Sequence, residues 1–389
     1  MLAAAIVTFG RHPDWAQFSF GLSVICMTRR FQWPLLTFCA VLCLALFVLV
    51  LAGKRKGGWL VGLLPVGAML GFRFALDPLN ALQVVEQPPM VTAQDATFIS
   101  DQQWVVGLMI NGQPIAFPYH TLFRTPVVLH QEFDKRVLLV WSAFSNRGVA
   151  FEIDRDYRAR DLDIVSIPAN ALLIYNTRLG EFMNGATGLT RDGKAPTGIR
   201  LVVPVTHTLW SDWKTRHPST RVMGLLQASD QTLPAAPVLP RYALPDVPSA
   251  LRNDQSIVFI QTSPPVALLS TQVTTSPLNL KSGSQPFVVF RDAAGTVRAF
   301  DRRLDDLTPR FTRSPVKRGA ASTTPADLLD SDTQTTWSEE GRSLAASGDM
   351  KGAKLRPLIA DENVYWGVMK YWFPDLEPYT DIKPPNPAD

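Results

Sequence analysis

The chain has 389 residues, of which 46% are hydrophobic and 19% charged, a composition typical of folded rather than disordered proteins. The apolar excess lies in the first 85 residues, so about 300 residues remain, enough for two domains of ordinary size. The net charge is only +4, and no long Lys/Arg block with interleaved aromatic residues follows the apolar segment, so we exclude nucleic acid as a partner. All three cysteines, Cys26, Cys39 and Cys43, lie in or beside that segment. The rest of the chain therefore has no disulfide framework or thiolate metal site, and we predict no cofactor.

An uninterrupted apolar segment runs from Trp33 to Ala52 without a charged residue. At about 1.5 Å per residue, a helix of this length matches the roughly 30 Å hydrocarbon core of a bilayer. Signal-peptide cores are shorter, and this segment continues into Lys54, Arg55 and Lys56 rather than into a small-residue cleavage site. We therefore predict an uncleaved transmembrane helix over residues 33–52, preceded by an N-terminal flank of residues 1–32.

A second apolar segment, residues 59–76, is interrupted only by Arg73. The long arginine side chain can reach the headgroups from near a helix end, so we interpret the segment as a second span that ends at Asp77-Pro78. The alternative is an interfacial or core helix. The predicted anchor, residues 33–76, thus has one or two transmembrane helices.

The charges beside these segments predict the side of the membrane that the rest of the chain occupies. Arg29 and Arg30 precede the first segment and Lys54, Arg55 and Lys56 follow it, so the loop after the segment has one more positive charge. No Lys or Arg occurs between Leu76 and Arg124. Because positively charged flanks stay in the cytoplasm, we predict a bacterial inner-membrane protein whose soluble region is periplasmic or extracellular. The bilayer is therefore its first expected partner. Met27, which precedes two arginines, is an alternative start of the chain.

Short β-prone runs with turn residues between them follow a proline-containing neck at residues 86–91. The first two runs, WVVGLMI and PIAFP, are joined by Asn111-Gly112, the strongest short-range hairpin signal. Further strands are expected at residues 137–141, 148–153, 171–175 and 199–205, and a short helix at Leu209–Arg216. The sequence therefore predicts a mainly β (α+β) fold.

Five prolines, at positions 234, 237, 240, 245 and 248, indicate a linker over residues 226–250, because proline continues neither a helix nor a central strand. On its two sides, Gly185, Trp210 and Pro218 recur as Gly341, Trp366 and Pro374 at one fixed offset. A fixed offset favours duplication over the alternative, a chance agreement of Trp and Pro. We predict two related β-rich units, residues 90–225 and 251–381, each ending in a short helix.

Several motifs of this region resemble those of a bacterial family, domain of unknown function 3179 (DUF3179). They are VVGLMINGQPIAFP, His130, LVWSAFSNRGVAFEID, WSDWKTRHPSTRVM and TTWSEEGRSLAASGDMKGAKL, in the family's order and at similar spacing. The resemblance covers residues 104–379. It implies a fold and an architecture but no reaction, because no activity is established for the family.

The chain departs from the family at one motif. Where the family typically has Cys-Pro-Leu-Cys, this chain has Ser142-Ala143-Phe144-Ser145. A Cys-x-x-Cys pair can bind a metal as thiolates or form a disulfide, whereas a serine hydroxyl does neither near neutral pH. We therefore expect a divergent member of the family that has no metal site here.

A serine nucleophile is the sharpest catalytic hypothesis. Ser142 or Ser145 would be deprotonated by His130, with Asp134 or Asp154 orienting the imidazole. The alternative is that both serines form a turn and bond to nearby backbone. We predict an envelope protein whose non-catalytic soluble region binds a small ligand or another protein; the alternative is a divergent enzyme that uses these serines with His130. Convergence of the three side chains in one pocket would distinguish the two.

Overall fold

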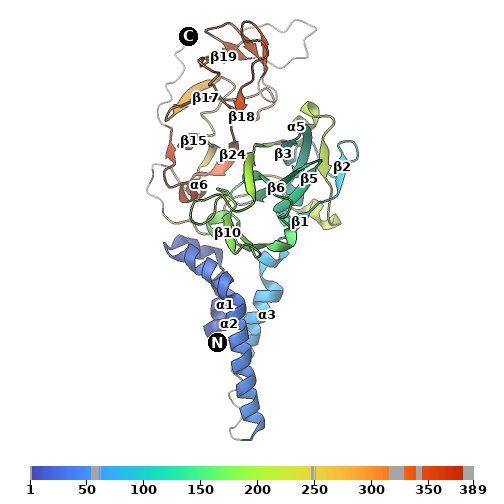
Figure 1. Cartoon of the computed structure of the whole chain (residues 1–389), viewed down its shortest axis with the longest axis vertical. Helices are drawn as coiled ribbons and strands as arrows, with labels where there is room; N and C mark the ends of the chain where they lie inside the picture. Colours follow the sequence, from blue (N-terminus) through green and yellow to red (C-terminus); the bar gives the residue numbers. More distant parts are fainter. Residues whose placement is uncertain are drawn as a thin grey trace.

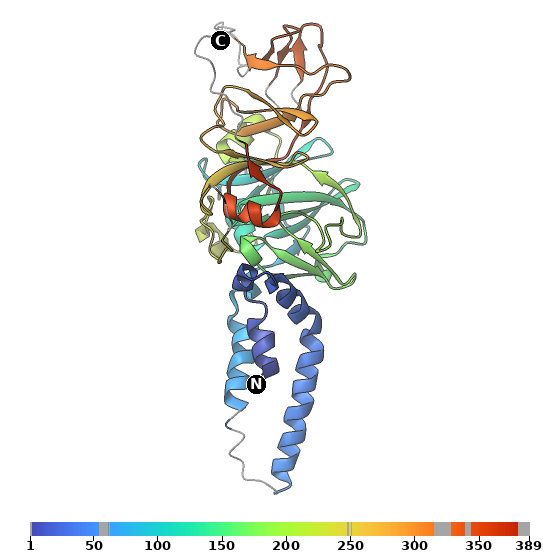
Figure 2. The ribbon, with the colours of Figure 1, turned by 90° about the vertical axis from the view of Figure 1, so that its left-hand side faces the viewer.

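The computed structural model describes residues 2–53, 61, 63–246, 249, 251–314, 328–338 and 344–379. This described part is mainly β, with six sheets and few helices. Figures 1 and 2 show the N-terminal helices projecting from one end of the β-rich region as a stalk, and strands β17 (Gln285–Arg291) and β19 (Phe311–Arg313) lying toward the opposite end.

The stalk contains helix α1 (Leu2–Phe9), helix α2 (Gly21–Leu51) and helix α3 (Leu63–Gly71). Among the described residues, α2 is the one helix that is long and apolar enough to cross a membrane, and its most apolar stretch is not buried. It contains nearly all of the predicted span at 33–52 but begins twelve residues earlier, because the preceding sequence continues the helix without a break.

The second predicted span, residues 59–76, lies partly outside the described residues. Helix α3 continues into a π-helical turn, η3 (Phe72–Leu76), and a 3₁₀ turn, η4 (Pro78–Ala81), then joins the stalk to the β-rich region. The helical part from residue 63 to residue 76 is roughly 21 Å long, less than a bilayer core. Helix α1 packs against both α2 and α3.

The N-terminal flank is part of the folded structure. A 3₁₀ turn, η1 (Pro13–Gln17), separates α1 from α2. Ile25 and Cys26 of α2 pack against Val165, Leu173 and Phe182 of the β-rich region. The residues before Met27 therefore make tertiary contacts with the β-rich region, which their sequence does not indicate.

The β-rich region begins with three sheets, whose strand orders are β1-β5-β6-β7-β11, β12-β3-β4-β13-β2 and β10-β9-β8. The strands are β1 (Val84–Glu86), β2 (Met90–Thr92), β3 (Trp104–Ile110), β4 (Gln113–Pro118), β5 (Val127–Glu132), β6 (Lys135–Ser142), β7 (Arg147–Ile153), β8 (Leu162–Ser166), β9 (Leu173–Asn176), β10 (Glu181–Asn184), β11 (Ile199–Val203), β12 (Val205–Leu209) and β13 (Arg221–Met223). Helix α4 (Tyr119–Arg124) follows β4, and helix α5 (Trp210–Arg216) follows β12. Three 3₁₀ turns, η5 (Ala159–Asp161), η6 (Pro168–Asn170) and η7 (Ala228–Thr232), complete this part.

Three more sheets follow, with strand orders β24-β14-β15-β25, β16-β17-β18-β23 and β19-β20-β21-β22. Their strands are β14 (Ser256–Ile260), β15 (Val266–Leu269), β16 (Leu278–Ser282), β17 (Gln285–Arg291), β18 (Val297–Asp301), β19 (Phe311–Arg313), β20 (Leu328–Asp330), β21 (Thr336–Trp337), β22 (Ala345–Ser347), β23 (Arg356–Pro357), β24 (Ala360–Tyr365) and β25 (Glu377–Pro378). Helix α6 (Trp366–Trp372) lies between β24 and β25.

Local sequence explains most of these elements. Asn111 and Gly112 have positive φ angles of 51° and 79°, as a tight hairpin turn between β3 and β4 requires. The predicted strand at 199–205 is divided at Pro204, so that β11 and β12 join different sheets, because proline lacks the N–H that a continuous ladder needs. The neck at residues 86–91 joins the end of β1 to the start of β2, and these strands pair with β5 and β13 respectively.

Candidate functional site

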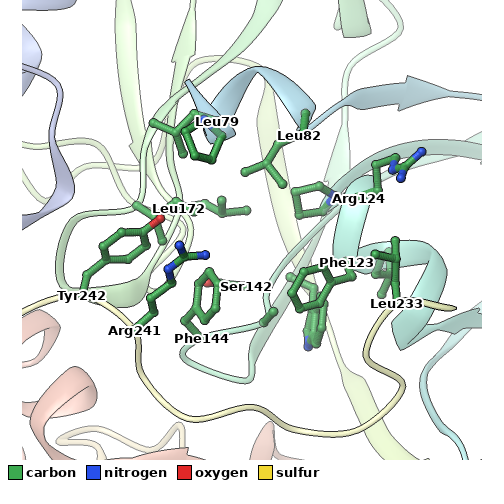
Figure 3. Close-up of a pocket in the computed structure, with 17 residues that line it drawn as sticks. Leu79, Leu82, Phe123, Arg124, Ser142, Phe144, Leu172, Leu233, Arg241 and Tyr242 are labelled. Carbon is green, nitrogen blue, oxygen red and sulfur yellow. The ribbon is translucent and has the colours of Figure 1, made fainter. Parts of the chain in front are cut away.

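A cavity of about 210 Å³ lies where the stalk joins the β-rich region. Its wall comes from segments far apart in the sequence, and Figure 3 shows their side chains converging on one space. The lining residues share a mostly apolar character: Pro78, Leu79, Ala81, Leu82, Leu122, Phe123, Arg124, Pro126, Trp141, Ser142, Ala143, Phe144, Ile167, Leu172, Leu233, Arg241 and Tyr242. Pockets that bind small molecules are typically concave and apolar with few polar groups, as this one is, although most are larger.

Few charged groups line the cavity. Arg124 contacts Gln227 and lies 3.5 Å from Asp230, so its charge is partly compensated. The Arg241 guanidinium lies 5.9 Å from the centre of the Tyr242 ring. Burial raises the pKa of the Tyr242 phenol, which therefore stays neutral at physiological pH.

Asn170 holds the proline-rich linker against this cavity. Its side-chain oxygen accepts hydrogen bonds of 2.8 Å from the backbone N–H groups of Arg241 and Tyr242, and its side-chain nitrogen donates to the Tyr242 carbonyl at 2.9 Å. Asn170 is fully buried and has a φ of 64°, a left-handed conformation that asparagine tolerates better than most residues. Asn170, the last residue of η6, thus positions two lining residues from the linker.

The two candidate serines lie together in the turn between β6 and β7. Ser142 lines the cavity, but its hydroxyl donates a 2.7 Å hydrogen bond to the Asn170 carbonyl. The Ser145 hydroxyl is completely buried, accepts a hydrogen bond from the Arg147 N–H at 3.2 Å and lies 3.4 Å from the Ser142 carbonyl. Both hydroxyls therefore bond to backbone, as turn-forming serines do.

His130 does not share this site. It pairs with Val137 across β5 and β6, and Ser142 lies five residues further along β6, roughly 16 Å away. Its Nε2 atom lies 3.2 Å from Glu132 instead. Burial lowers the pKa of His130 despite that carboxylate, so the ring is mainly neutral at pH 7.

The two candidate orienting carboxylates are also remote from the serines. Asp134 occupies the opposite end of the β5–β6 hairpin and accepts a 2.8 Å hydrogen bond from Asn111. Asp154 follows β7 and pairs with Arg200. The structure therefore brings Ser142 and Ser145 together but separates them from His130, Asp134 and Asp154.

A buried polar cluster, which we call the central cluster, consists of Tyr119, Arg147, His207 and Asp361. The Tyr119 hydroxyl and His207 Nδ1 are 2.6 Å apart, and His207 Nε2 lies 3.1 Å from Asp361 Oδ1. Arg147 forms an ion pair with Asp361 and donates to Gln261 at 3.0 Å. This cluster joins the first three sheets to the last three.

Burial sets the protonation of the central cluster. It lowers the pKa of His207 to about 3, with the nearby Arg147 guanidinium contributing, so the imidazole is neutral. Burial also lowers the pKa of Arg147 to about 9, which still leaves the guanidinium charged at pH 7. No local sequence signal identified these residues, because Arg147 and Asp361 meet only through the tertiary fold.

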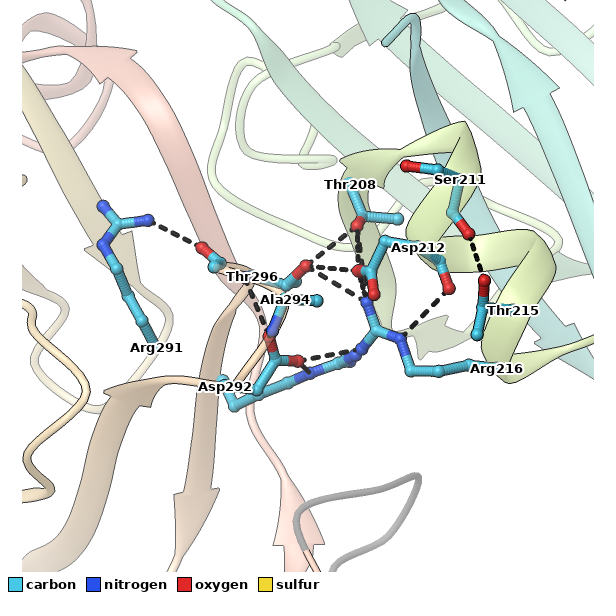
Figure 4. A network of polar contacts seen from close by, with 11 residues as sticks. Thr208, Ser211, Asp212, Thr215, Arg216, Arg291, Asp292, Ala294 and Thr296 are labelled. Atoms are coloured by element: carbon cyan, nitrogen blue, oxygen red, sulfur yellow. Dashed lines mark hydrogen bonds and ion pairs between the residues drawn. The ribbon is translucent and has the colours of Figure 1, made fainter. Parts of the chain in front are cut away.

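A second polar network joins the same two parts of the chain (Figure 4). Arg216 of α5 donates to Asp292 at 2.9 Å and to Thr296 at 3.1 Å. Thr208 lies 2.8 Å from Thr296, which in turn donates to Asp212 at 2.7 Å. The network is compact and mutually compensated, which is typical of a packing interface rather than of a ligand site.

Within the described ranges, no three His, Cys, Asp or Glu side chains form a group that could hold a metal ion. Comparison with known proteins gives one match: the family model described as "Protein of unknown function (DUF3179)" matches residues 81–376, about three quarters of the chain. No curated protein and no solved structure matches. The predicted resemblance is thus confirmed over a slightly different range, and the chain belongs to the DUF3179 family.

Proposed function

We propose that this protein is a membrane-anchored binding protein that takes a small apolar or amphipathic ligand in the cavity beneath its β-rich region. The observation that carries the proposal is the cavity itself, which is walled by apolar side chains at the point where the stalk begins. The bilayer and a small ligand are the proposed partners, and nucleic acid is not among them.

The arrangement of the stalk supports an anchor that crosses the membrane twice. Arg29, at the start of the apolar part of α2, bonds to Asp163 of the β-rich region. The chain returns to that same region at η4, immediately after α3 and η3. A chain that leaves and rejoins one side of a membrane crosses it an even number of times, so a hairpin of two spans fits the anchor. The described helical part, residues 63–76, supplies about 21 Å of the second crossing, and the predicted span at 59–76 begins before it.

Charge supports placing the β-rich region outside the bacterial cytoplasm. The sequence between the two helical segments contains Lys54, Arg55 and Lys56, which favour the cytoplasmic side. A reporter fused after Asp389 should then be active only in the periplasm or outside the cell. Activity of a cytoplasm-specific reporter at this position would contradict the proposed inner-membrane topology.

Equivalent topologies support the proposed duplication into units 90–225 and 251–381. The order β12-β3-β4-β13 corresponds to β24-β14-β15-β25, and β5-β6-β7-β11 corresponds to β16-β17-β18-β23. Trp210 and Trp366 each begin a helix, with a lysine four residues later whose amine lies about 6 Å from the ring centre. Gly341, the equivalent of Gly185, lies outside the described residues. In each unit a short strand follows the helix, so the helix is not the last element.

The chemistry around the cavity favours binding over catalysis. The Ser142 hydroxyl is engaged by the Asn170 carbonyl, and the described residues that line the cavity include no histidine or carboxylate that could take its proton. The serine enzyme with His130 as base therefore has no support from the geometry.

Photoaffinity labelling tests the binding proposal. The full-length protein in lipid nanodiscs is irradiated with a photoreactive fatty-acid analogue, and labelled peptides are identified by mass spectrometry. We expect labels on the segments that contain Phe123 and Phe144, in addition to labels on α2 from the surrounding lipid. Ala143→Trp, which fills the cavity, should reduce the cavity labels at least about tenfold, since each buried methylene that is displaced forfeits about 0.8 kcal/mol.

Ala236→Trp is the matched control, because Ala236 is exposed in the linker. It should leave the cavity labels unchanged, and neither variant should alter labelling of α2. Absence of cavity labels in the wild-type protein, or equal labelling in the two variants, would remove the basis for a ligand in the cavity.

A further inference from the structure

A separate hollow of about 480 Å³ lies next to the cavity, and Leu79 and Leu82 line both. The hollow is bounded by η3 and η4, which connect α3 to the β-rich region, and by β8. We call it the basic hollow. Its polar and charged lining residues are Arg11, Arg73, Asn80, Gln83, Arg160 and Asp163. Three arginines and one carboxylate therefore face a common space at the top of the stalk.

Arg11 carries a buried charge that no carboxylate compensates. Only 4% of its surface is exposed, and its guanidinium donates to the backbone carbonyls of Val165 at 2.7 Å and Ile164 at 3.1 Å. Within the described part of the chain it forms no ion pair. Carbonyl oxygens satisfy N–H donors but do not cancel a full charge, and an uncompensated buried charge is costly.

The other charges of the basic hollow leave this excess in place. Arg73 is also 4% exposed; it bonds to Asp77 at 3.2 Å, but its Nε atom has no hydrogen-bond partner among the described residues. Asp163 is engaged by Arg29. Arg160 is largely exposed at the rim. The hollow thus presents a net positive charge with unsatisfied donor capacity.

The position of the basic hollow matches the headgroup layer of a membrane. Exposed aromatic side chains surround the top of the stalk: Phe18, Phe20, Phe31, Trp33, Phe72 and Phe74. Tryptophan is enriched at membrane–water interfaces, exposed apolar patches mark membrane contacts, and arginines near helix ends extend to the headgroup level. Below them, the side chains that α2 exposes as far as Leu51 are uncharged and, apart from Thr37, apolar.

We propose that the basic hollow binds the phosphate group of an anionic membrane phospholipid, with Arg11 and Arg73 as inner donors and Arg160 at the rim. Guanidinium groups bind phosphate through charge-assisted, often bidentate hydrogen bonds. The bound phosphate supplies the counter-charge that Arg11 lacks. This inference goes beyond the proposed function, because the ligand of the apolar cavity is a different molecule and either site can fail alone.

Native mass spectrometry of the full-length protein in detergent tests the proposal. We expect one phosphatidylglycerol molecule to be retained at concentrations at which phosphatidylcholine is lost. Arg11→Gln should weaken this retention at least about tenfold, because it removes charged hydrogen bonds. Arg160→Gln should weaken phosphatidylglycerol retention about fivefold. Because Arg160 is exposed, this variant should fold, so the proposal can be tested even if Arg11→Gln does not fold.

Arg191→Gln is the matched control, since Arg191 is an exposed arginine beside the same end of α2 and bonds to Ser23. It should change phosphatidylglycerol retention less than twofold. An equal loss of phosphatidylglycerol retention in this control would show that diffuse electrostatic attraction, and not the basic hollow, retains the lipid, and it would overturn the proposed site. If millimolar inorganic phosphate displaces the lipid and itself binds, the proposal that the ligand is a phospholipid would be overturned, and the basic hollow would be a site for free phosphate.

Discussion

Replacing Asp361 with asparagine tests whether the central cluster holds the two parts of the β-rich region together. The Asp361 carboxylate is completely buried and pairs with Arg147, whose side chain is 1% exposed. The substitution preserves shape but leaves the guanidinium without a counter-charge. Breaking a buried pair from one side costs about 3–5 kcal/mol, because the remaining charge stays desolvated. At about 2–4 °C per kcal/mol for large domains, the unfolding midpoint should fall by at least about 6 °C.

The assay is thermal unfolding of the full-length protein, followed by circular dichroism of the β signal. Asp254→Asn is the matched control, because Asp254 forms an exposed pair with Arg252 and surface pairs contribute at most about 1 kcal/mol. A second variant, Arg147→Met with Asp361→Leu, should recover part of the loss, since apolar residues can replace a buried pair at little cost. A midpoint for Asp361→Asn as high as that of Asp254→Asn would refute a stabilising role for the pair.

Three further predictions concern the same region. Burial keeps His207 neutral in the folded state, whereas in the unfolded chain it binds a proton below a pKa of about 6.5, so stability falls as the pH falls. Between pH 7 and pH 5 this residue alone should lower the free energy of unfolding by about 2 kcal/mol, and His207→Gln should reduce that pH dependence by the same amount in urea titrations. Asn170→Gly keeps the left-handed backbone but removes the bonds to the linker, so it should lower cavity labelling by the photoreactive fatty acid; unchanged labelling would contradict that role. Metal analysis should find no stoichiometric zinc or iron in the wild-type protein or in the double variant Ser142→Cys/Ser145→Cys. Bound metal in the wild type would refute the expectation that this turn has no metal site. Bound metal in the double variant alone would identify a metal site that the chain has lost.

Local sequence patterns predicted the strands and the main hairpin well. The alternation and turn signals of WVVGLMI-Asn111-Gly112 are contained within a few residues, so they specify β3 and β4 without help from the rest of the chain. The apolar run at 33–52 likewise indicates its helix directly, although nothing in the sequence marks where α2 begins.

Features made by distant segments were not predictable in this way. The cavity combines the residues after the stalk with the β6–β7 turn and the linker, and none of these segments has a binding motif. Arg11 is a single arginine in an apolar flank, and only its contact with the carbonyls of β8 reveals it as a buried charge. Ser142 and His130 do not meet because the turn at Phe133-Asp134 fixes the register of the β5–β6 hairpin, which places His130 near the turn and Ser142 near the open end.

Two polar networks connect the first three sheets to the last three, and in each of them a turn of one part contacts the other part. The β6–β7 turn, which carries Ser142 and Ser145, takes part in one of these networks. Arg147, at the end of the β6–β7 turn, reaches Asp361 on β24, while Asp292, in the corresponding β17–β18 turn, reaches Arg216 on α5. Under the proposed duplication these two turns are equivalent, and their exchange of contacts is what two related units packed about an approximate two-fold axis would show. In the first unit, the same turn also carries Ser142, which faces the cavity. The turn at Ser142–Ser145 therefore lies between the cavity wall on one side and the interface on the other. A ligand bound in the cavity, as proposed, would lie only a few residues from the central cluster.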